Sequence, residues 1–235
     1  MTAPEVLEQL AQMGSESTKK TLMKHGAKEP FFGVKVGDMK KIQKKVKKDH
    51  ELSLALYDTG NSDAMYLAGL IADEDKITKE DLQNWVEKAY WSQLSEYTVA
   101  WVAAESRFGY ELACEWIDSD DESIASAGWA TLGSLVGIKQ DDDLPVDELR
   151  QLLERVRKEI HQAQNRVRYT MNGFVIAAGS SVAALTELAI EIGAENGKVH
   201  VEMGGTACKV PFAVDYIEKV KGAGRIGKKR KMARC

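Results

Sequence analysis

The stretch Tyr90-Trp91-Ser92-Gln93-Leu94-Ser95-Glu96, near the middle of the chain, ends one helical pattern and begins another. From residue 50 onward the same unit recurs, a helical stretch of roughly 10–16 residues followed by a short polar break, as in packed helices. The pattern predicts helices over residues 50–58, 62–73, 78–89, 92–106, 109–118, 121–136, 145–161, 164–178, 181–193 and 207–221. Three further helices are expected before residue 50.

Capping residues and helix breakers support this interpretation. Asn61, Thr78 with Asp81, Asp120 and Ser180 stand where helices are expected to begin, and glycines stand near several expected ends. Strand signals are nearly absent, except for an alternating run over residues 198–203 that could be extended. Helix pairs at a spacing of about 40 residues predict an all-α fold, a curved α-α superhelix in which the pairs stack into a solenoid. The units share little sequence identity, so a compact α-bundle is the competing interpretation.

Composition excludes several classes of protein. No run of eighteen apolar residues exists, so no membrane span is expected, and the N-terminus lacks the order of a signal peptide. The 3 cysteines and 4 histidines are scattered, so neither disulfides nor a metal site is expected, and a cytoplasmic location suits them. No phosphate-cradling glycine loop or nucleophile elbow appears, and no cofactor is expected.

Charge is distributed unevenly along the chain. The formal net charge is −4, yet residues 1–50 carry +5, residues 219–235 carry +8 and the remainder carries −17. Two basic ends therefore flank an acidic middle. The total charge alone would not suggest that the chain binds a polyanion such as nucleic acid. The two basic ends favour such binding.

A lysine-rich helix is expected over residues 38–48. Six lysines, among them the candidate phosphate contacts Lys40, Lys41, Lys44 and Lys45, lie opposite an apolar stripe. A solvated surface is the plain interpretation of such a run, because most charge runs have that role. On a concave surface the same lysines would contact DNA phosphates without reading base sequence.

The sequence predicts a HEAT-like helical domain over residues 1–220, followed by a basic, flexible C-terminal tail over residues 221–235. Glycines punctuate the tail and no apolar stripe is present, so a mobile arm is expected. Lys228, Lys229, Arg230 and Lys231 are its candidate DNA contacts, and a disordered solubilising tail is the alternative.

Two arginines and one tryptophan are further candidates for a functional site. Arg166 and Arg168 begin a helix that also contains Asn172 and Gly173, both poor interior helix residues that a functional face would explain. Capping and salt bridges are the structural alternative for the arginines. The five tryptophans are expected in the core, with Trp91 the candidate exception because it stands at a helix junction.

Four stretches resemble the DNA alkylation repair family, the AlkD-like alkylpurine DNA glycosylases. They are Phe31-Phe32-Gly33-Val34-Lys35-Val36-Gly37-Asp38-Met39-Lys40-Lys41-Ile42, Lys88-Ala89-Tyr90-Trp91-Ser92-Gln93-Leu94-Ser95, the segment from Trp116-Ile117 to Leu132, and Arg168-Tyr169-Thr170-Met171-Asn172-Gly173-Phe174-Val175. The resemblance spans roughly residues 1–220. It implies a solenoid of HEAT-like repeats and release of N3- or N7-alkylated purines from DNA, with a carboxylate that stabilises positive charge on the sugar and two tryptophans beside it.

Only some of the residues that the family uses at its active site are present at the matching positions of this sequence. Trp91 matches the first tryptophan, Phe174 stands at the position of the second, and Ala127 lies at or near that of a phosphate-contacting arginine. Ser95 replaces the expected carboxylate, and serine cannot supply a negative charge. On an α-helix the adjacent Glu96 would point about 100° away. Asp63, Asp118 and Glu122 are alternative carboxylates among which the sequence does not choose.

Two functions of different classes follow. The first is a DNA-binding protein of the DNA alkylation repair family, with weak, altered or absent glycosylase activity at Trp91, Ser95 and Phe174. The second is a non-enzymatic scaffold that binds a basic protein partner through its acidic surface, as helical solenoids commonly do. The sign of the charge on the concave surface would discriminate between them.

Overall fold

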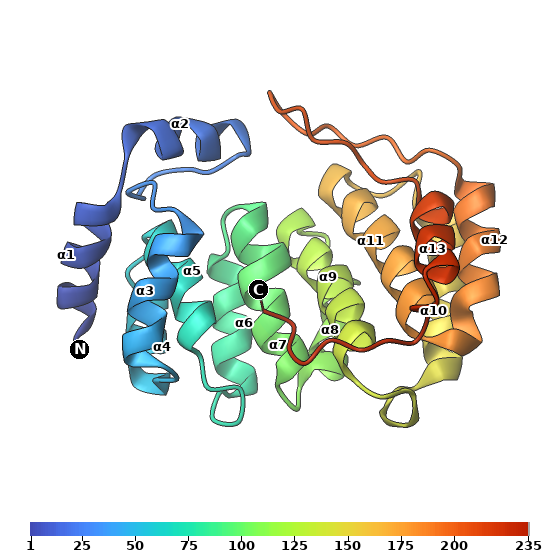
Figure 1. Ribbon diagram of the computed structural model, residues 1–235, viewed down its shortest axis with the longest axis horizontal. Coiled ribbons are helices and arrows are strands. Elements are labelled where there is room, and N and C mark those ends of the chain that lie inside the picture. The colour runs from blue at the N-terminus through green and yellow to red at the C-terminus, as the bar shows by residue number, and fades with distance from the viewer. Residues whose placement is uncertain (235) are drawn as a thin grey trace.

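The computed structural model describes residues 1–234, whose regular secondary structure consists of helices with no β-strand (Figure 1). The α-helices are α1 (Ala3–Met13), α2 (Glu16–Lys24), α3 (Val36–Val46), α4 (His50–Tyr57), α5 (Ser62–Ile71), α6 (Lys79–Lys88), α7 (Ala100–Glu105), α8 (Gly109–Trp116), α9 (Glu122–Ile138), α10 (Val146–Glu159), α11 (Asn165–Ser181), α12 (Thr186–Asn196) and α13 (Ala213–Gly222). A π-helical segment, η1 (Leu94–Val99), precedes α7, and short 3-10 turns are η2 (Asp141–Asp143) and η3 (Ala183–Leu185).

From α4 onward the helices alternate between two layers. An inner row consists of α5, η1 with α7, α9, α11 and α13, each packed on the next, while α4, α6, α8, α10 and α12 form the outer row. The predicted superhelix of stacked pairs is confirmed, and the compact bundle is excluded. The last predicted helix begins at Ala213 rather than at residue 207, because residues 197–212 form an extended arm that projects from the body (Figure 1).

Side chains at the helix starts bond the free backbone N–H groups there. Asn61 Oδ1 accepts from the N–H groups of Asp63 and Ala64, and Thr78 forms a reciprocal capping box with Asp81. Both caps match the sequence prediction. The cap of α9 is Asp121 rather than the predicted Asp120.

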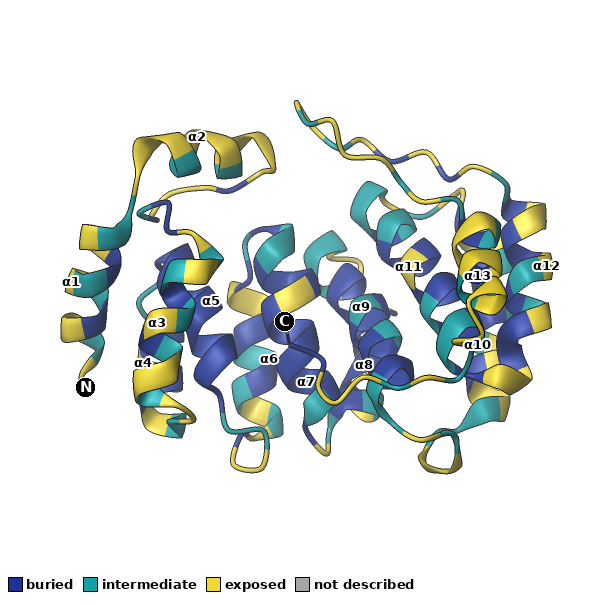
Figure 2. Cartoon of the chain, viewed as in Figure 1, coloured by how far each residue is buried: buried dark blue, intermediate teal, exposed yellow. Residues whose placement is uncertain are grey.

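The long helix α9 joins two hydrophobic cores. One core extends from Val6 to α8 and includes Ala127 and Leu135, whereas the other extends to α13 and includes Trp129 and Leu132. Figure 2 shows α9 buried over most of its length. Small residues make this possible. A Cβ at Gly128 would lie 2.8 Å from the backbone nitrogen of Ile117, so α8 and α9 approach more closely than a larger residue would allow.

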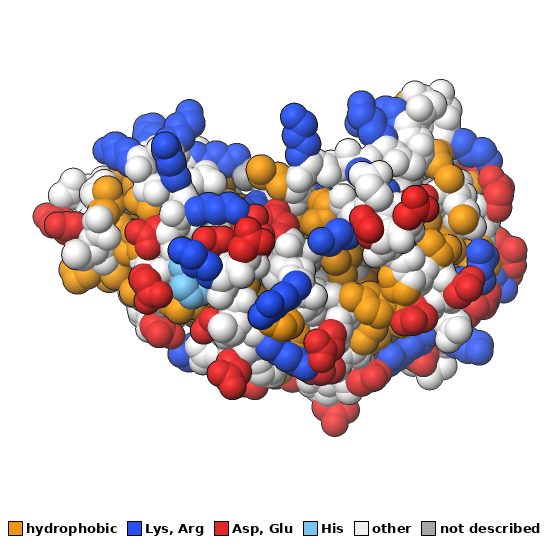
Figure 3. Space-filling model, turned by 90° about the horizontal axis from the view of Figure 1, so that it is seen from below, with side chains coloured by type: hydrophobic (Ala, Val, Ile, Leu, Met, Phe, Trp, Pro, Cys, Tyr) orange, Lys and Arg blue, Asp and Glu red, His pale blue; other side chains and the backbone are white. Residues whose placement is uncertain are grey.

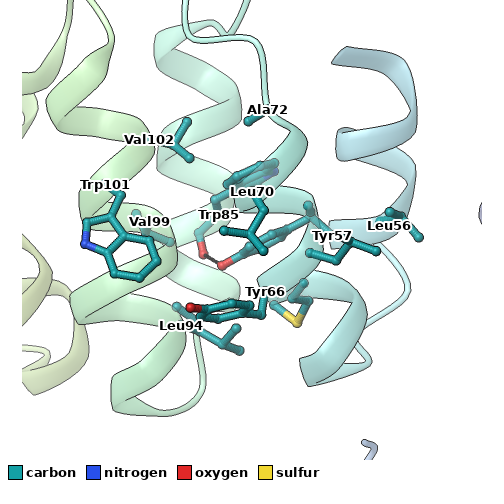
Figure 4. Close-up of a cluster of buried hydrophobic side chains, with 14 of the residues drawn as sticks. Leu56, Tyr57, Tyr66, Leu70, Ala72, Trp85, Leu94, Val99, Trp101 and Val102 are labelled. Carbon is teal, nitrogen blue, oxygen red and sulfur yellow. Dashed lines mark hydrogen bonds between the residues drawn. The ribbon is translucent and has the colours of Figure 1, made fainter. Parts of the chain in front are cut away.

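Aromatic side chains fill the core of the first half (Figure 4). Tyr57 stacks on Trp85 with ring centroids 4.1 Å apart, and its hydroxyl donates to the Trp85 carbonyl at 2.7 Å. Tyr66 meets Trp101 edge to face. All five tryptophans are buried, including Trp91 at 8% exposure, so the expected exception is largely covered as well.

The connection between α2 and α3 is fixed by one buried carboxylate. Asp63 on α5 accepts three backbone N–H groups, from Phe32 at 2.6 Å, Gly33 at 2.9 Å and Val34 at 3.2 Å. Burial raises the pKa of the Asp63 carboxyl, and these three donors act against that rise. Asp63 therefore holds the N-terminal helices on the solenoid.

The C-terminal residues 225–234, here called the strap, run back across the ends of the inner helices (Figure 1). Gly227 donates to the Ser180 carbonyl and Arg230 to that of Gly137, and Lys229 bonds the Val136 carbonyl. The sequence predicts a mobile arm, and the structure instead packs these residues against the body. The reason is that α11 and α9 present free C-terminal carbonyls that the strap satisfies. Cys235 lies outside the described residues.

Arg234 secures the end of the strap. Its side chain is 7% exposed, forms a salt bridge with Glu105 on α7, contacts Glu74 at 2.6 Å and donates to the carbonyl of Ala72 at 2.8 Å. The backbone N–H of Ala233 also donates to Glu105. One guanidinium thus joins the ends of α5 and α7 to the chain terminus.

No helix of the described residues is long and apolar enough to cross a membrane. The cytoplasmic location stays a prediction.

Replacing Arg234 should destabilise the fold. Arg234→Ala leaves Glu105 buried and unpaired, which costs about 3–5 kcal/mol. We expect a melting temperature lower by roughly 10 °C in calorimetry. Lys228→Ala, an exposed position in the same strap, is the control and should change little. Equal melting temperatures for the two variants would show that the strap does not stabilise the solenoid.

Candidate nucleic-acid interface

The starts of three inner elements converge on a cleft with a volume of about 1100 Å³. Ser95 and Glu96 from η1, Glu122 and Ser126 from α9, and Arg166 and Tyr169 from α11 line its floor, and Tyr66, Tyr90, Trp91, Tyr97 and Trp101 add aromatic walls. The end of α2 and the tip of the arm, residues 202–209, cover it from outside. The two covering segments meet, since a Cβ at Gly204 would lie 3.0 Å from the carbonyl of Lys24.

A π-helical turn shapes the floor of the cleft. In η1 the N–H of Ala100 donates to the carbonyl of Ser95, five residues earlier, so the turn is wider than an α-helical one. Ser95 is 1% exposed and Glu96 is 5% exposed, and both line the cleft. The α-helical prediction that Glu96 points away is therefore wrong. The sequence contains no signal for the π-turn, and this is why Glu96 is missed.

Glu96 forms a buried ion pair with Arg166. Arg166 Nε donates to Oε1 at 2.7 Å and Nη2 to Oε2 at 2.5 Å, a bidentate arrangement across 70 residues of sequence. Burial disfavours the charged guanidinium, but the hydrogen bonds to Glu96 outweigh it and raise the pKa of Arg166. Burial raises the pKa of the Glu96 carboxyl, and the hydrogen bonds and positive charge of Arg166 act against that rise. The carboxylate is not available to a ligand without breaking this pair.

Part of the solvent-accessible surface of the cleft belongs to aromatic rings. Tyr97 is 40% exposed and meets Trp101 edge to face with centroids 5.5 Å apart. Partial burial and the neighbouring Tyr169 raise the pKa of Tyr97, so its phenol stays neutral. Tyr169 stacks under the Arg166 guanidinium at 4.4 Å. A planar ligand would thus find accessible ring surface at Tyr97.

Two predicted residues meet at the floor. Trp91 donates its indole N–H to Ser62 Oγ at 2.8 Å, which fixes the ring. Ser95 Oγ is buried and has no hydrogen-bond partner among the described residues. A buried hydroxyl without a partner is costly, so a water or ligand group is expected beside it.

Charge in the cleft is balanced. Its lining contains three cations, Lys24, Arg166 and Lys209, and three carboxylates, Glu96, Glu122 and Glu202. Glu122 also accepts the backbone N–H of Arg166 at 2.8 Å. Of the alternative carboxylates considered from sequence, only Glu122 lines the cleft. Asp63 holds the α2–α3 connection, and Asp118 pairs with Arg155 at 2.6 Å.

Other sequence candidates lie elsewhere. Phe174 is fully buried against Trp129, with centroids 5.4 Å apart, so it does not line the cleft. Arg168 is half-buried on α11 and is absent from the cleft lining. The basic candidates also lie outside it: Lys40, Lys41, Lys44 and Lys45 on α3, and Lys228, Lys229, Arg230 and Lys231 on the strap.

Comparison with known proteins gives consistent matches. The family model described as DNA alkylation repair enzyme matches residues 6–216. The uncharacterized protein Lmo0209 of Listeria monocytogenes is 36% identical over 219 residues, 91% of this chain and 94% of that protein. Lin0241 of Listeria innocua, also uncharacterized, is 35% identical with the same coverage. A solved structure from a new family related to the HEAT-like repeat DNA glycosylases with affinity for branched DNA structures covers 100% of both chains, with 39% identity and a TM-score of 0.92.

Replacing Arg166 should lower the stability of the fold, because Glu96 would then be buried without its ion-pair partner. Arg166→Met is expected to lower stability at neutral pH by about 3–5 kcal/mol, because a carboxylate is left buried alone. Burial raises the pKa of Glu96. The destabilisation should therefore shrink as the pH falls and Glu96 takes up a proton, and grow as the pH rises. Denaturant unfolding between about pH 5 and pH 8, the range in which globular proteins are usually most stable, would measure both effects.

Two controls accompany this variant. Arg168→Met, on the same helix, should show no such pH dependence. Adding Glu96→Gln to Arg166→Met should restore part of the stability, since no charge then remains buried. An Arg166→Met variant with a stability equal to that of Arg168→Met would contradict the argument.

Proposed function

Because the chain belongs to the DNA alkylation repair enzyme family, we propose that it binds DNA at branched or locally unpaired sites, with little or no glycosylase activity. The observation that carries this proposal is the state of the carboxylate at the cleft floor. Ser95 has no charge, and the adjacent Glu96 is neutralised by Arg166 at 2.5 Å. At positions 95 and 96 the cleft floor therefore offers no unpaired negative charge, and the exposed ring of Tyr97 lies in the same cleft.

Base excision needs the opposite arrangement. The resemblance implies a carboxylate that stabilises positive charge on the sugar, and such stabilisation requires a charge aimed at the reacting group. A carboxylate paired bidentately with arginine has most of its charge compensated. Glu122 is the remaining floor carboxylate, and it is held by the backbone N–H of Arg166.

Binding to a branch point suits the aromatic cleft. Bases at a branch or gap lose stacking neighbours and can stack on an exposed ring, which is worth about 1–3 kcal/mol per base. Tyr97 supplies such a ring, at 40% exposure. The similar solved structure comes from a family with affinity for branched DNA. The exposed lysines of α3 are proposed as phosphate contacts that add affinity without sequence preference.

The ring of Tyr97 should matter for this binding. Tyr97→Ala is expected to weaken binding to a four-way DNA junction by roughly 5- to 100-fold, the equivalent of about 1–3 kcal/mol. Fluorescence anisotropy with a labelled junction at fixed salt concentration would measure it. Tyr216→Ala is the matched control, because Tyr216 is 51% exposed on α13 and does not line the cleft. Equal losses in both variants would argue against the cleft as the DNA site.

Base release can be tested separately. DNA containing 7-methylguanine, incubated with the protein, should release no base above the uncatalysed background. Ser95→Asp should not restore release while the Glu96–Arg166 pair persists. Release by the natural protein that is lost in Glu122→Gln would instead identify a working carboxylate and refute the non-catalytic part of the proposal.

A further inference from the structure

A second cavity, of about 690 Å³, lies at the opposite ends of the inner helices. It is bounded by the ends of α5, α7 and α9, by α3 and by the strap. Five lysines line it, and we call it the basic trough: Lys44, Lys47, Lys48, Lys139 and Lys231. From Ser123 at the cleft to Ile138 at the trough, α9 rises about 22 Å. The two sites are therefore separated by most of the length of the solenoid layer.

Negatively charged groups lie at the floor of the trough. Helix C-termini carry partial negative charge, and the lining also contains the carboxylates of Glu74 and Glu105. Arg234 pairs with both carboxylates and donates to the carbonyls of Gly69 and Ala72. Its guanidinium is thus bonded to both carboxylates and to the end of α5, and Lys48 also pairs with Glu74. Six cations against two carboxylates give the lining a net charge of +4, whereas the cleft has none.

Four of these lysines have no side-chain partner within the described residues. Lys48 contacts Glu74 at 2.5 Å, but no ion pair or side-chain hydrogen bond is formed by Lys44, Lys47, Lys139 or Lys231 within residues 1–234. Lys47 also has a φ of 64°, in a region that glycine adopts without strain and lysine rarely does. Strained backbone at this position presents an unpaired ammonium group to the trough. Figure 3 shows Lys and Arg side chains gathered along the hollowed edge of the molecule.

The chemistry of the trough selects a polyanion rather than one small phosphate. Sites for a single phosphate use backbone N–H groups at helix N-termini, and the helices here present their C-termini. Lysines act as point charges without the planar, bidentate geometry of arginine, so they suit backbone phosphates of any sequence. Their charges come from α3, the end of α9 and the strap, which spreads them along an open surface.

We infer that the basic trough binds the sugar–phosphate backbone of a second duplex arm of a branched DNA whose branch point occupies the cleft. The inference rests on the proposed function and adds a second contact region to it. A linear duplex that occupies one region leaves the other empty. A junction contacts both, which converts two weak contacts into one tighter complex.

Charge reversal in the trough tests this inference. Lys47→Glu, Lys139→Glu and Lys231→Glu, combined, should weaken binding to a four-way junction at least 10-fold and change binding to a linear duplex less than 2-fold. The slope of log affinity against log salt concentration for the junction should fall by about 3, as phosphate contacts are lost. The control combines Lys158→Glu, Lys198→Glu and Lys219→Glu, exposed lysines outside both sites, with the same change in net charge.

The outcomes separate the two proposals. Unchanged junction affinity in the trough variant, or equal losses for junction and duplex, would overturn the trough inference while the Tyr97 result still supports the cleft. A natural protein that binds neither DNA would overturn both. Replacing the same three lysines with glutamine should give a smaller loss in the same direction, and thermal unfolding of each variant would show that the fold is intact.

Discussion

The buried pair of Glu96 and Arg166 is the constraint on which the cleft depends. A carboxylate or a guanidinium buried alone costs several kcal/mol, so each side chain requires the other. Glu96 comes from η1 and Arg166 from α11, with α9 between them, and the bidentate contact sets the spacing of three inner elements. The π-turn at Ala100 belongs to the same arrangement, because the wider turn lets both Ser95 and Glu96 line the cleft.

Charge neutrality in the cleft and positive charge in the trough follow from where arginines are placed. Arg166 pairs with a carboxylate that lines the cleft, and Arg234 pairs with two that line the trough. In the cleft the exposed ring of Tyr97 lies beside this ion pair, whereas in the trough four lysines have no ion-pair partner within residues 1–234. The acidic middle of the chain is partly neutralised on the outer layer, where Asp118 pairs with Arg155 and Glu191 with Arg157. Much of the negative charge therefore lies away from the two sites.

The sequence predicts the elements of this structure well because helix starts and ends are encoded locally. Asn61 and Thr78 cap their helices as expected, and the helix-pair rhythm gives the superhelix. Contacts between residues far apart in the sequence could not be predicted in this way. Arg234 reaches Glu105 across 129 positions and Arg166 reaches Glu96 across 70, and no local pattern encodes either pair. Phe174 fails as a site residue for the same reason, since its ring turns into the core against Trp129, a choice made by packing.

The absence of a carboxylate at position 95 can be explained by the buried carboxylate of the neighbouring Glu96. A carboxylate at position 95 would lie in a buried turn directly beside Glu96, and two carboxylates sharing a buried site repel each other strongly. Arg166 already gives Nε and Nη2 to Glu96 and cannot make the same bidentate contact with a second carboxylate. A chain that keeps the Glu96–Arg166 pair therefore favours a neutral residue at position 95. Ser95 is such a neutral residue, and its Oγ is buried without a hydrogen-bond partner among the described residues.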